Sequence, residues 1–147
     1  MKNIHYGKFF LLFALLLGLT NNSYATSMIT VEGGYIKASI PGSDITAAYM
    51  TLKNTGDKAI TLQKISSTIS DRIEIHEHSM ANGMMRMREV GEVVIDAKSH
   101  VVLQPSGLHL MIFSLKEQLT EQNVIPLTLT FSNDTEIKIQ LPVRKYK

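Results

Sequence analysis

The 147-residue chain contains no cysteine. This absence excludes a disulfide framework, thiolate metal sites and thiol catalysis together. The chain also lacks a long segment with a 3.6-residue hydrophobic period, a nucleophile elbow, a phosphate-binding loop and a nucleotide-binding fingerprint. It has no internal repeat, low-complexity tract or domain linker. The sequence therefore gives no support to the enzyme classes that these motifs mark, and it indicates one domain.

The first 25 residues have the three parts of a secretory signal peptide. Residues 1–8 carry two lysines and no acid, residues 9–19 are an apolar run interrupted only by a glycine, and a small-x-small triplet ends at Ala25. The apolar run is too short to cross about 30 Å of hydrocarbon. We predict cleavage after Ala25 and no membrane span in the mature chain. An uncleaved N-terminal anchor is the alternative, and no cysteine follows the run that could carry a lipoprotein anchor.

Cleavage at this position would also change the charge balance. It removes two lysines and no acidic residue, so the basic count falls from 15 to 13 against 13 acidic residues. The mature chain, residues 26–147, is then formally neutral, which removes the main support for a nucleic-acid partner. Its length is sufficient to bury a core without covalent crosslinks.

Short extended segments separated by turn residues run along the mature chain. The pattern predicts strands at residues 28–31, 35–40, 45–52, 59–65, 93–95, 100–104, 108–112, 127–131 and 137–141, with a hairpin between the fourth and fifth of these. Residues 114–123 are the one polar stretch that could form a helical turn, and Pro142 should end the last strand. Nine or ten such segments predict an all-β fold, a sandwich or barrel of Greek-key type.

The hairpin is predicted from Asn82-Gly83, because a type I′ turn needs positive φ at both central residues. In that register, His78 lies opposite Met87 and His76 lies opposite Glu89. Isoleucines at positions 73 and 75 alternate with the two histidines, so both histidines should lie on the face that points away from the isoleucines.

A second stretch, Leu108-His109-Leu110-Met111-Ile112, alternates in the same way. As a strand it presents an apolar face that is complete without Met111, while His109 and Met111 share the other face. The two stretches hold three of the five histidines and five of the eight methionines. Imidazole nitrogen and thioether sulfur together suit a soft cation, Cu(I) above all. We therefore interpret the stretches as parts of one copper site.

The spacing of these residues resembles a known family. His76, Met87, His109 and Met111 match in full the signature H-x10-M-x21-H-x-M of the periplasmic copper chaperones called PCu(A)C. The likeness extends over nearly all of the mature chain, and its clearest segments are residues 47–56, 75–77, 83–88, 108–111 and 126–131.

The resemblance implies a cupredoxin-like β-sandwich, residues 26–147, that works in the periplasm as a carrier and not as an enzyme. It implies one Cu(I) per chain, bound near the surface by His76, Met87, His109 and Met111. The usual acceptor in the family is the CuA centre of cytochrome c oxidase subunit II, or another copper assembly factor. We expect the mature chain to be a monomer.

The chain departs from the family pattern at two places. Where relatives often have methionine two residues after the first histidine, this chain has His78, a further or competing ligand that would raise the affinity for Cu(II). Some relatives also end in a His/Met-rich tail with a second copper site. Residues 143–147 contain neither residue type, so we predict one site.

Two other functions compete with the carrier. A secreted metalloenzyme would hold Zn(II) or Cu(II) with His76, His78 and His109 and use Glu77 as base, although the hairpin puts Glu77 on the opposite face. A metal-free sandwich used for adhesion or assembly would leave the His/Met spacing to chance. A blue-copper electron carrier has still less support, because its defining cysteine ligand is absent.

The remaining methionines and histidine have simpler interpretations. Met80, Met84 and Met85 flank the hairpin turn, where we expect an apolar rim or docking surface, with Met85 close enough to line the copper pocket. Met50 alternates with Leu52 and should lie in the core. His100 should lie on the surface.

Overall fold

The computed structural model describes residues 28–145, and this part of the chain contains ten β-strands and no helix. The strands are β1 Ile29–Lys37, β2 Thr46–Asn54, β3 Ile60–Ser66, β4 Arg72–Ala81, β5 Met84–Glu89, β6 Val93–Ile95, β7 Ser99–Leu103, β8 Leu108–Phe113, β9 Val124–Phe131 and β10 Glu136–Arg144. The predicted all-β class is confirmed. The predicted signal peptide and its cleavage site lie outside the described residues. Residues 28–145 contain no helix long and apolar enough to cross a membrane.

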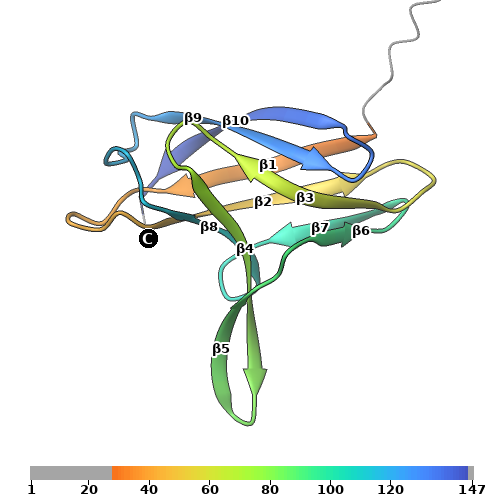
Figure 1. Cartoon of the computed structure of the whole chain (residues 1–147), viewed down its shortest axis with the longest axis horizontal. Helices are drawn as coiled ribbons and strands as arrows, with labels where there is room; N and C mark the ends of the chain where they lie inside the picture. The colour runs from red at the N-terminus through yellow and green to blue at the C-terminus, as the bar shows by residue number, and fades with distance from the viewer. Residues whose placement is uncertain (1–27, 146–147) are drawn as a thin grey trace, which may run out of the picture.

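The strands form two layers around one core (Figure 1). One layer has the order β5-β4-β8-β2-β1, with β7 also paired to β2, and the other has the order β10-β9-β3-β6. The layers join where β1 pairs in parallel with β10 over two residue pairs. Between them lie side chains that are almost fully buried: Phe131, Ile36, Leu52, Leu62, Ile95, Leu110, Ile112, Leu127 and Leu129. All ten strands of the sandwich thus lie between Ile29 and Arg144.

Strict alternation produces this core. In β9, Ile125, Leu127, Leu129 and Phe131 are buried, while the residues between them are exposed or half-buried. Successive side chains of a strand point to opposite faces, so a period of two places every second residue in the core. The same rule puts Leu110 and Ile112 of β8 inside and leaves the intervening positions for the outer face.

The first strand corrects one prediction. Two strands were expected, at residues 28–31 and 35–40, but the structure has a single strand, β1, that ends at Lys37. Its pairing with β2 shifts register between Glu32 and Tyr35, and Gly33 between them has φ of 62°. A bulge with glycine in the left-handed region absorbs the extra residue without breaking the ladder.

Pro142 was predicted to end the last strand, and this prediction is wrong: β10 continues past it to Arg144. The Val143 N–H donates to the carbonyl of Asn123 on the β9 side at 3.1 Å. Alternation along β10 then turns the nitrogen of Pro142 away from β9, where an N–H is not needed for that ladder. The parallel pairing with β1 begins just after the proline, at Val143.

The polar stretch 114–123 forms bends and a turn, and the possible helical turn is absent there. The side-chain oxygen of Asn123 accepts hydrogen bonds from both the N–H and the hydroxyl of Thr120, at 2.7 and 3.0 Å. Such local side-chain bonds offer the backbone an alternative to helical pairing.

Asn54, at the end of β2, joins three segments of backbone. Its amide nitrogen donates to the carbonyls of Lys58, Ile95 and Asp96 at 2.8, 3.1 and 3.1 Å, and its amide oxygen accepts from Gly56 N–H at 2.9 Å. The side chain of Asn54 is buried. If it were removed, each of these backbone groups would lose a hydrogen-bond partner that water cannot easily replace.

Replacing Asn54 by alanine should therefore lower the free energy of unfolding by about 2 to 4 kcal/mol, because several buried polar groups are left without partners. Urea unfolding followed by circular dichroism measures the change. Asn133→Ala is the matched control: Asn133 is exposed and accepts one hydrogen bond, from Thr135 N–H, so the loss there should stay below about 1 kcal/mol. Equal losses in the two variants would contradict the role given to Asn54.

Candidate metal centre

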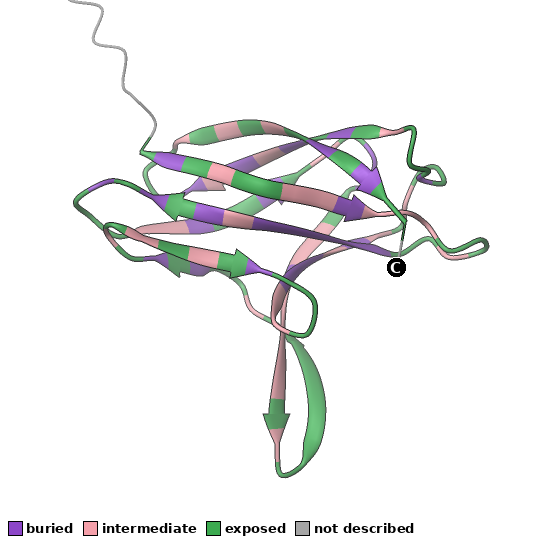
Figure 2. Ribbon diagram, turned by 180° about the vertical axis from the view of Figure 1, so that it is seen from behind, coloured by how far each residue is buried: buried purple, intermediate pink, exposed green. Residues whose placement is uncertain are grey.

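The hairpin β4–β5 forms in the predicted register. Asn82 and Gly83 have φ of 52° and 75°, and His78 lies opposite Met87 and His76 opposite Glu89. The Val90 N–H donates to the carbonyl of Ile75 at 2.8 Å, so the odd-numbered residues of β4 bond toward the β5 side. The hairpin extends beyond the body of the sandwich, and every residue of β5 is exposed (Figure 2).

The other edge of β4 pairs with β8, which brings the two His/Met stretches together. His76 lies directly opposite His109, and Glu74 lies opposite Met111. The ring centroids of His76 and His109 are 6.1 Å apart, and those of His78 and His109 are 5.0 Å apart. Ile75, Leu110 and Ile112 point the other way, into the core. The predicted separation of the two faces is confirmed for both strands.

A cavity of about 240 Å³ opens on this outer face. Its lining includes His78 of β4, Met87 of β5, and His109 and Met111 of β8, with Tyr49 of β2 beside them. Two imidazoles and two thioethers from three strands thus surround one space. His76 is not part of this lining; it lies next to His109 on the same face.

His109 is oriented by the backbone. Its Nδ1 lies 2.9 Å from the carbonyl oxygen of Gly107, and since a carbonyl only accepts, Nδ1 carries the hydrogen and Nε2 keeps its lone pair. Burial lowers the pKa of His109; the bond to Gly107 opposes this, and the neighbouring His78 and His76 lower it further. The ring is therefore held neutral, the form in which imidazole binds a metal.

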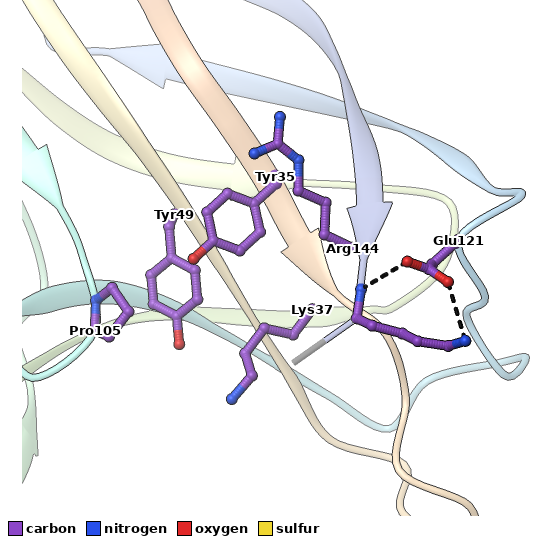
Figure 3. A pocket seen from close by; sticks show the side chains of 7 residues that line it. Tyr35, Lys37, Tyr49, Pro105, Glu121 and Arg144 are labelled. Carbon is purple, nitrogen blue, oxygen red and sulfur yellow. Dashed lines mark hydrogen bonds and ion pairs between the residues drawn. The ribbon is translucent and has the colours of Figure 1, made fainter. Parts of the chain in front are cut away.

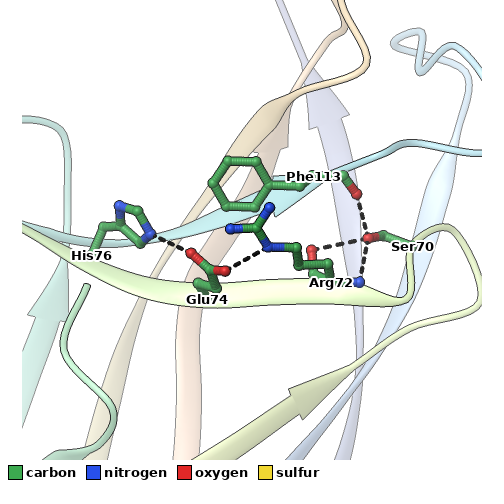
Figure 4. A network of polar contacts seen from close by, with 5 residues as sticks. All are labelled: Ser70, Arg72, Glu74, His76 and Phe113. Carbon is green, nitrogen blue, oxygen red and sulfur yellow. Dashed lines mark hydrogen bonds and ion pairs between the residues drawn. The ribbon is translucent and has the colours of Figure 1, made fainter. Parts of the chain in front are cut away.

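His76 is oriented by a carboxylate (Figure 4). Its Nε2 lies 2.8 Å from Oε2 of Glu74, whose other oxygen accepts from Arg72 Nε at 2.6 Å. The hydrogen bond with His76, followed by that with Arg72, lowers the pKa of Glu74. An ionised carboxylate accepts, so Nε2 carries the hydrogen, and in the neutral ring Nδ1 keeps the lone pair. Arg72 in turn lies over the ring of Phe113, 4.4 Å from its centroid.

Two imidazole nitrogens have no hydrogen-bond partner within the described part of the chain although they are buried: Nδ1 of His76 and Nδ1 of His78. Buried polar atoms without partners are uncommon and call for an explanation. A lone pair on such a nitrogen, on the face where His78 lines a cavity with the thioethers of Met87 and Met111, fits a soft cation such as Cu(I). Among residues 28–145, no group of three or more His, Cys, Asp or Glu side chains is placed so that it could hold a metal ion by itself.

Glu74 is not among the residues predicted from the sequence to belong to the site. Its position in the sequence does indicate such a role, because a residue two positions before His76 on a strand lies on the same face as His76. Glu77, the base of the alternative enzyme, points to the other face, as predicted, and pairs with Arg88 at 3.0 Å. Met50 is buried and His100 is exposed, as expected, and Met80, Met84 and Met85 form an exposed rim.

A second cavity of about 610 Å³ adjoins the first and shares Lys37 and Tyr49 with it (Figure 3). The ring centroids of Tyr35 and Tyr49 are 5.2 Å apart, and the guanidinium of Arg144 lies 5.2 Å from the centroid of Tyr35. Three basic side chains and one carboxylate, Glu121, line this space. The surface beside the His/Met cavity is therefore basic and aromatic.

Solved structures similar to this chain share its fold. A copper-bound PCuAC domain from PmoF2 superposes with a TM-score of 0.70 at 20% identity, over 84% of this chain and 97% of that one. The Cu(I) form of DR1885 from Deinococcus radiodurans has a TM-score of 0.67 at 26% identity, over 84% and 83% of the two chains. The predicted cupredoxin-like sandwich is confirmed by this likeness.

Sequence comparison gives the family. The "Putative lipoprotein Lxx21020" of Leifsonia xyli subsp. xyli (strain CTCB07) is 31% identical over 119 residues, which are 80% of this chain and 70% of that protein. The uncharacterized protein RP573 of Rickettsia prowazekii (strain Madrid E) is 30% identical over 98 residues, 66% of this chain and 54% of that protein. The family model described as "Putative lipoprotein LpqE-like" matches residues 29–143, nearly the whole sandwich. The chain belongs to the LpqE-like family.

Proposed function

We propose that this protein is a copper chaperone that carries one Cu(I) ion through His76, Met87, His109 and Met111. The observation that carries the proposal is the meeting of imidazoles and thioethers from β4, β5 and β8 at one outer face. Donors of these two types select a soft cation over Zn(II) or Mg(II). A copper-bound PCuAC domain and a Cu(I) form of DR1885 among the structures of the same fold support copper as the cargo.

Release of the ion would proceed by ligand exchange. The site offers no thiolate, so an acceptor with cysteine ligands binds Cu(I) more strongly and takes it stepwise. Met87 is half exposed while His109 is only 4% exposed, so an acceptor would displace Met87 first and His109 last. The acceptor we propose is the CuA centre of cytochrome c oxidase subunit II or another copper assembly factor. The basic rim of the adjoining cavity favours an acidic partner surface.

The place of action that we propose is the periplasm, after removal of residues 1–25. The three-part N-terminal segment supports this proposal, as do the relatives named as lipoproteins, since lipoproteins are exported. The mature domain is then residues 26–147, which we propose to act as a monomer. Glu77 is held in an ion pair on the face opposite the histidines, so it is badly placed to serve as a base for a reaction at the metal.

The thioether of Met111 should be essential for tight binding. Met111→Leu keeps the apolar volume and removes the sulfur, so we expect the Cu(I) affinity to fall at least about tenfold, or 1.4 kcal/mol. Competition with a chromophoric Cu(I) chelator measures it on residues 26–147. Met50→Leu, a change in the core, is the matched control and should bind Cu(I) as the wild type does.

The double variant His109→Ala with Met111→Ala should abolish tight Cu(I) binding. Unchanged binding in that variant would refute the chaperone function.

Glu74 should act through His76, because a carboxylate that fixes a ligating imidazole also raises its basicity. Glu74→Gln should lower the Cu(I) affinity by about 10- to 100-fold, the usual cost of such a loss. Glu77→Gln is the control, since Glu77 lies on the same strand but on the opposite face. Both variants are compared in the chelator competition, with circular dichroism to verify folding. Similar affinities in the two variants would mean that the carboxylate does not position the ligand.

His78 should govern the response to the oxidation state of copper. Imidazole suits Cu(II) as well as Cu(I), whereas thioether strongly prefers Cu(I). His78→Met should therefore leave Cu(I) binding within a few-fold of wild type and weaken Cu(II) binding by at least about tenfold. Electron paramagnetic resonance titration with Cu(II) provides the measurement, and His100→Met, a change at an exposed position of β7, is the control. Cu(II) binding unaffected by the change would remove His78 from the ligand set.

A further inference from the structure

The outer half of the hairpin carries methionines that the core does not use. Met80 and Met85 lie directly opposite each other and are 68% and 66% exposed. They share a face with His78 and Met87, because their positions on β4 and β5 differ by two residues. Soft donors therefore continue without interruption from the His/Met cavity to the tip of the hairpin, which extends away from the sandwich (Figure 1).

The pairing pattern brings these two side chains close. The hydrogen bond from Val90 to Ile75 places the bonded pairs at odd-numbered residues of β4, so Met80 and Met85 form a non-bonded pair. In such pairs the Cα atoms are about 4.5 Å apart and the side chains approach more closely than in bonded pairs. Two long, unbranched thioethers at this separation can bind one soft cation from both sides.

A third thioether lies within reach. Met87 is two residues along β5 from Met85, roughly 7 Å away at a rise of about 3.4 Å per residue. It also lines the cavity with His109 and Met111. Met87 can therefore serve as a donor shared between the hairpin and the cavity, which a stepwise passage of the ion requires.

We propose that Met80 and Met85, with Met87 as a shared third donor, form a second and weaker Cu(I) site at which the ion enters or leaves the His/Met cavity. The site is weaker because its two own donors are thioethers on an exposed ribbon, while the imidazole on the same face, that of His78, lines the cavity. The proposal that this site binds a soft metal depends only on the geometry of the hairpin. The proposal that the ion passes from it into the cavity rests on the proposed chaperone function. The ligand class is a monovalent soft cation, Cu(I) or its stable substitute Ag(I).

The chain supplies a matched control. Met84 lies on the same hairpin and is 55% exposed, but it pairs with Ala81 on the opposite face of the ribbon. A change of Met84 to leucine alters the exposed apolar surface as much as a change of Met85 does. Any effect confined to Met80 and Met85 therefore reports on their position on the donor face and not on hydrophobicity.

The test is an Ag(I) titration of residues 26–147 labelled with ¹³C at the methionine methyl groups. We expect the methyl signals of Met87 and Met111 to shift with the first equivalent and those of Met80 and Met85 with the second, while Met84 stays unchanged. The double variant Met80→Leu with Met85→Leu should bind one equivalent and load Cu(I) into the cavity several-fold more slowly than wild type in stopped-flow mixing with a Cu(I) donor complex. Met84→Leu should match wild type in both.

Each contrary result has one meaning. If only the cavity methyl groups respond, the hairpin site is refuted and the chaperone function stands. If the hairpin groups respond and the cavity groups do not, or if the variant without His109 and Met111 binds Cu(I) as tightly as wild type, the proposed function fails and the hairpin site survives. If the double leucine variant still binds two equivalents and changes only the rate of transfer to an acceptor, the methionines are a docking surface and the metal site is refuted.

Discussion

The pairing of β4 with a strand on each side is the constraint on which the site depends. Its even-numbered residues bond toward β8, as the His78 N–H does to the carbonyl of Gly107 at 3.2 Å, and its odd-numbered residues bond toward the β5 side. Both registers are therefore fixed by backbone hydrogen bonds. A slip of one residue against β8 would turn the histidines of β4 to the core face, and a slip against β5 would turn Met87 away from them. Donors from three strands meet because the strand between them is held at both edges.

This arrangement combines two requirements that usually conflict. A ligand set must be rigid to select a metal, and it must be accessible to hand the metal over. Along the outer face, His109 is buried and oriented by Gly107, and His76 is held by Glu74. Met87 is half exposed on β5, which is an edge strand within the described residues 28–145. Burial and side-chain hydrogen bonding thus decrease from the body of the sandwich toward the hairpin. The imidazoles are thus preorganised, and the thioethers retain the freedom to exchange.

Local rules made the donor strands predictable from sequence. Asn82-Gly83 requires one turn type, that turn sets the register of the hairpin, and alternation then assigns every side chain of β4 and β8 to a face. The contacts around the donors were less predictable, because they depend on which strands become neighbours. Arg72 over Phe113 and the position of Glu74 opposite Met111 arise only when β8 pairs with β4. The single β1 follows from its pairing with β2, and the continuation past Pro142 follows from pairing with β1, which is far away in sequence.

The absence of cysteine has a physical explanation at such a site. A thiolate would bind Cu(I) more tightly than a thioether, would need deprotonation and would be exposed to oxidation to a disulfide. Thioethers avoid the last two problems and would leave the copper complex weaker than that of an acceptor with cysteines, which would give the proposed transfer its direction. The selectivity lost with the thiolate must then come from imidazoles in fixed orientation. The carbonyl behind His109 and the carboxylate behind His76 supply that orientation, so the chemistry of the proposed metal site would extend to residues that never touch the metal.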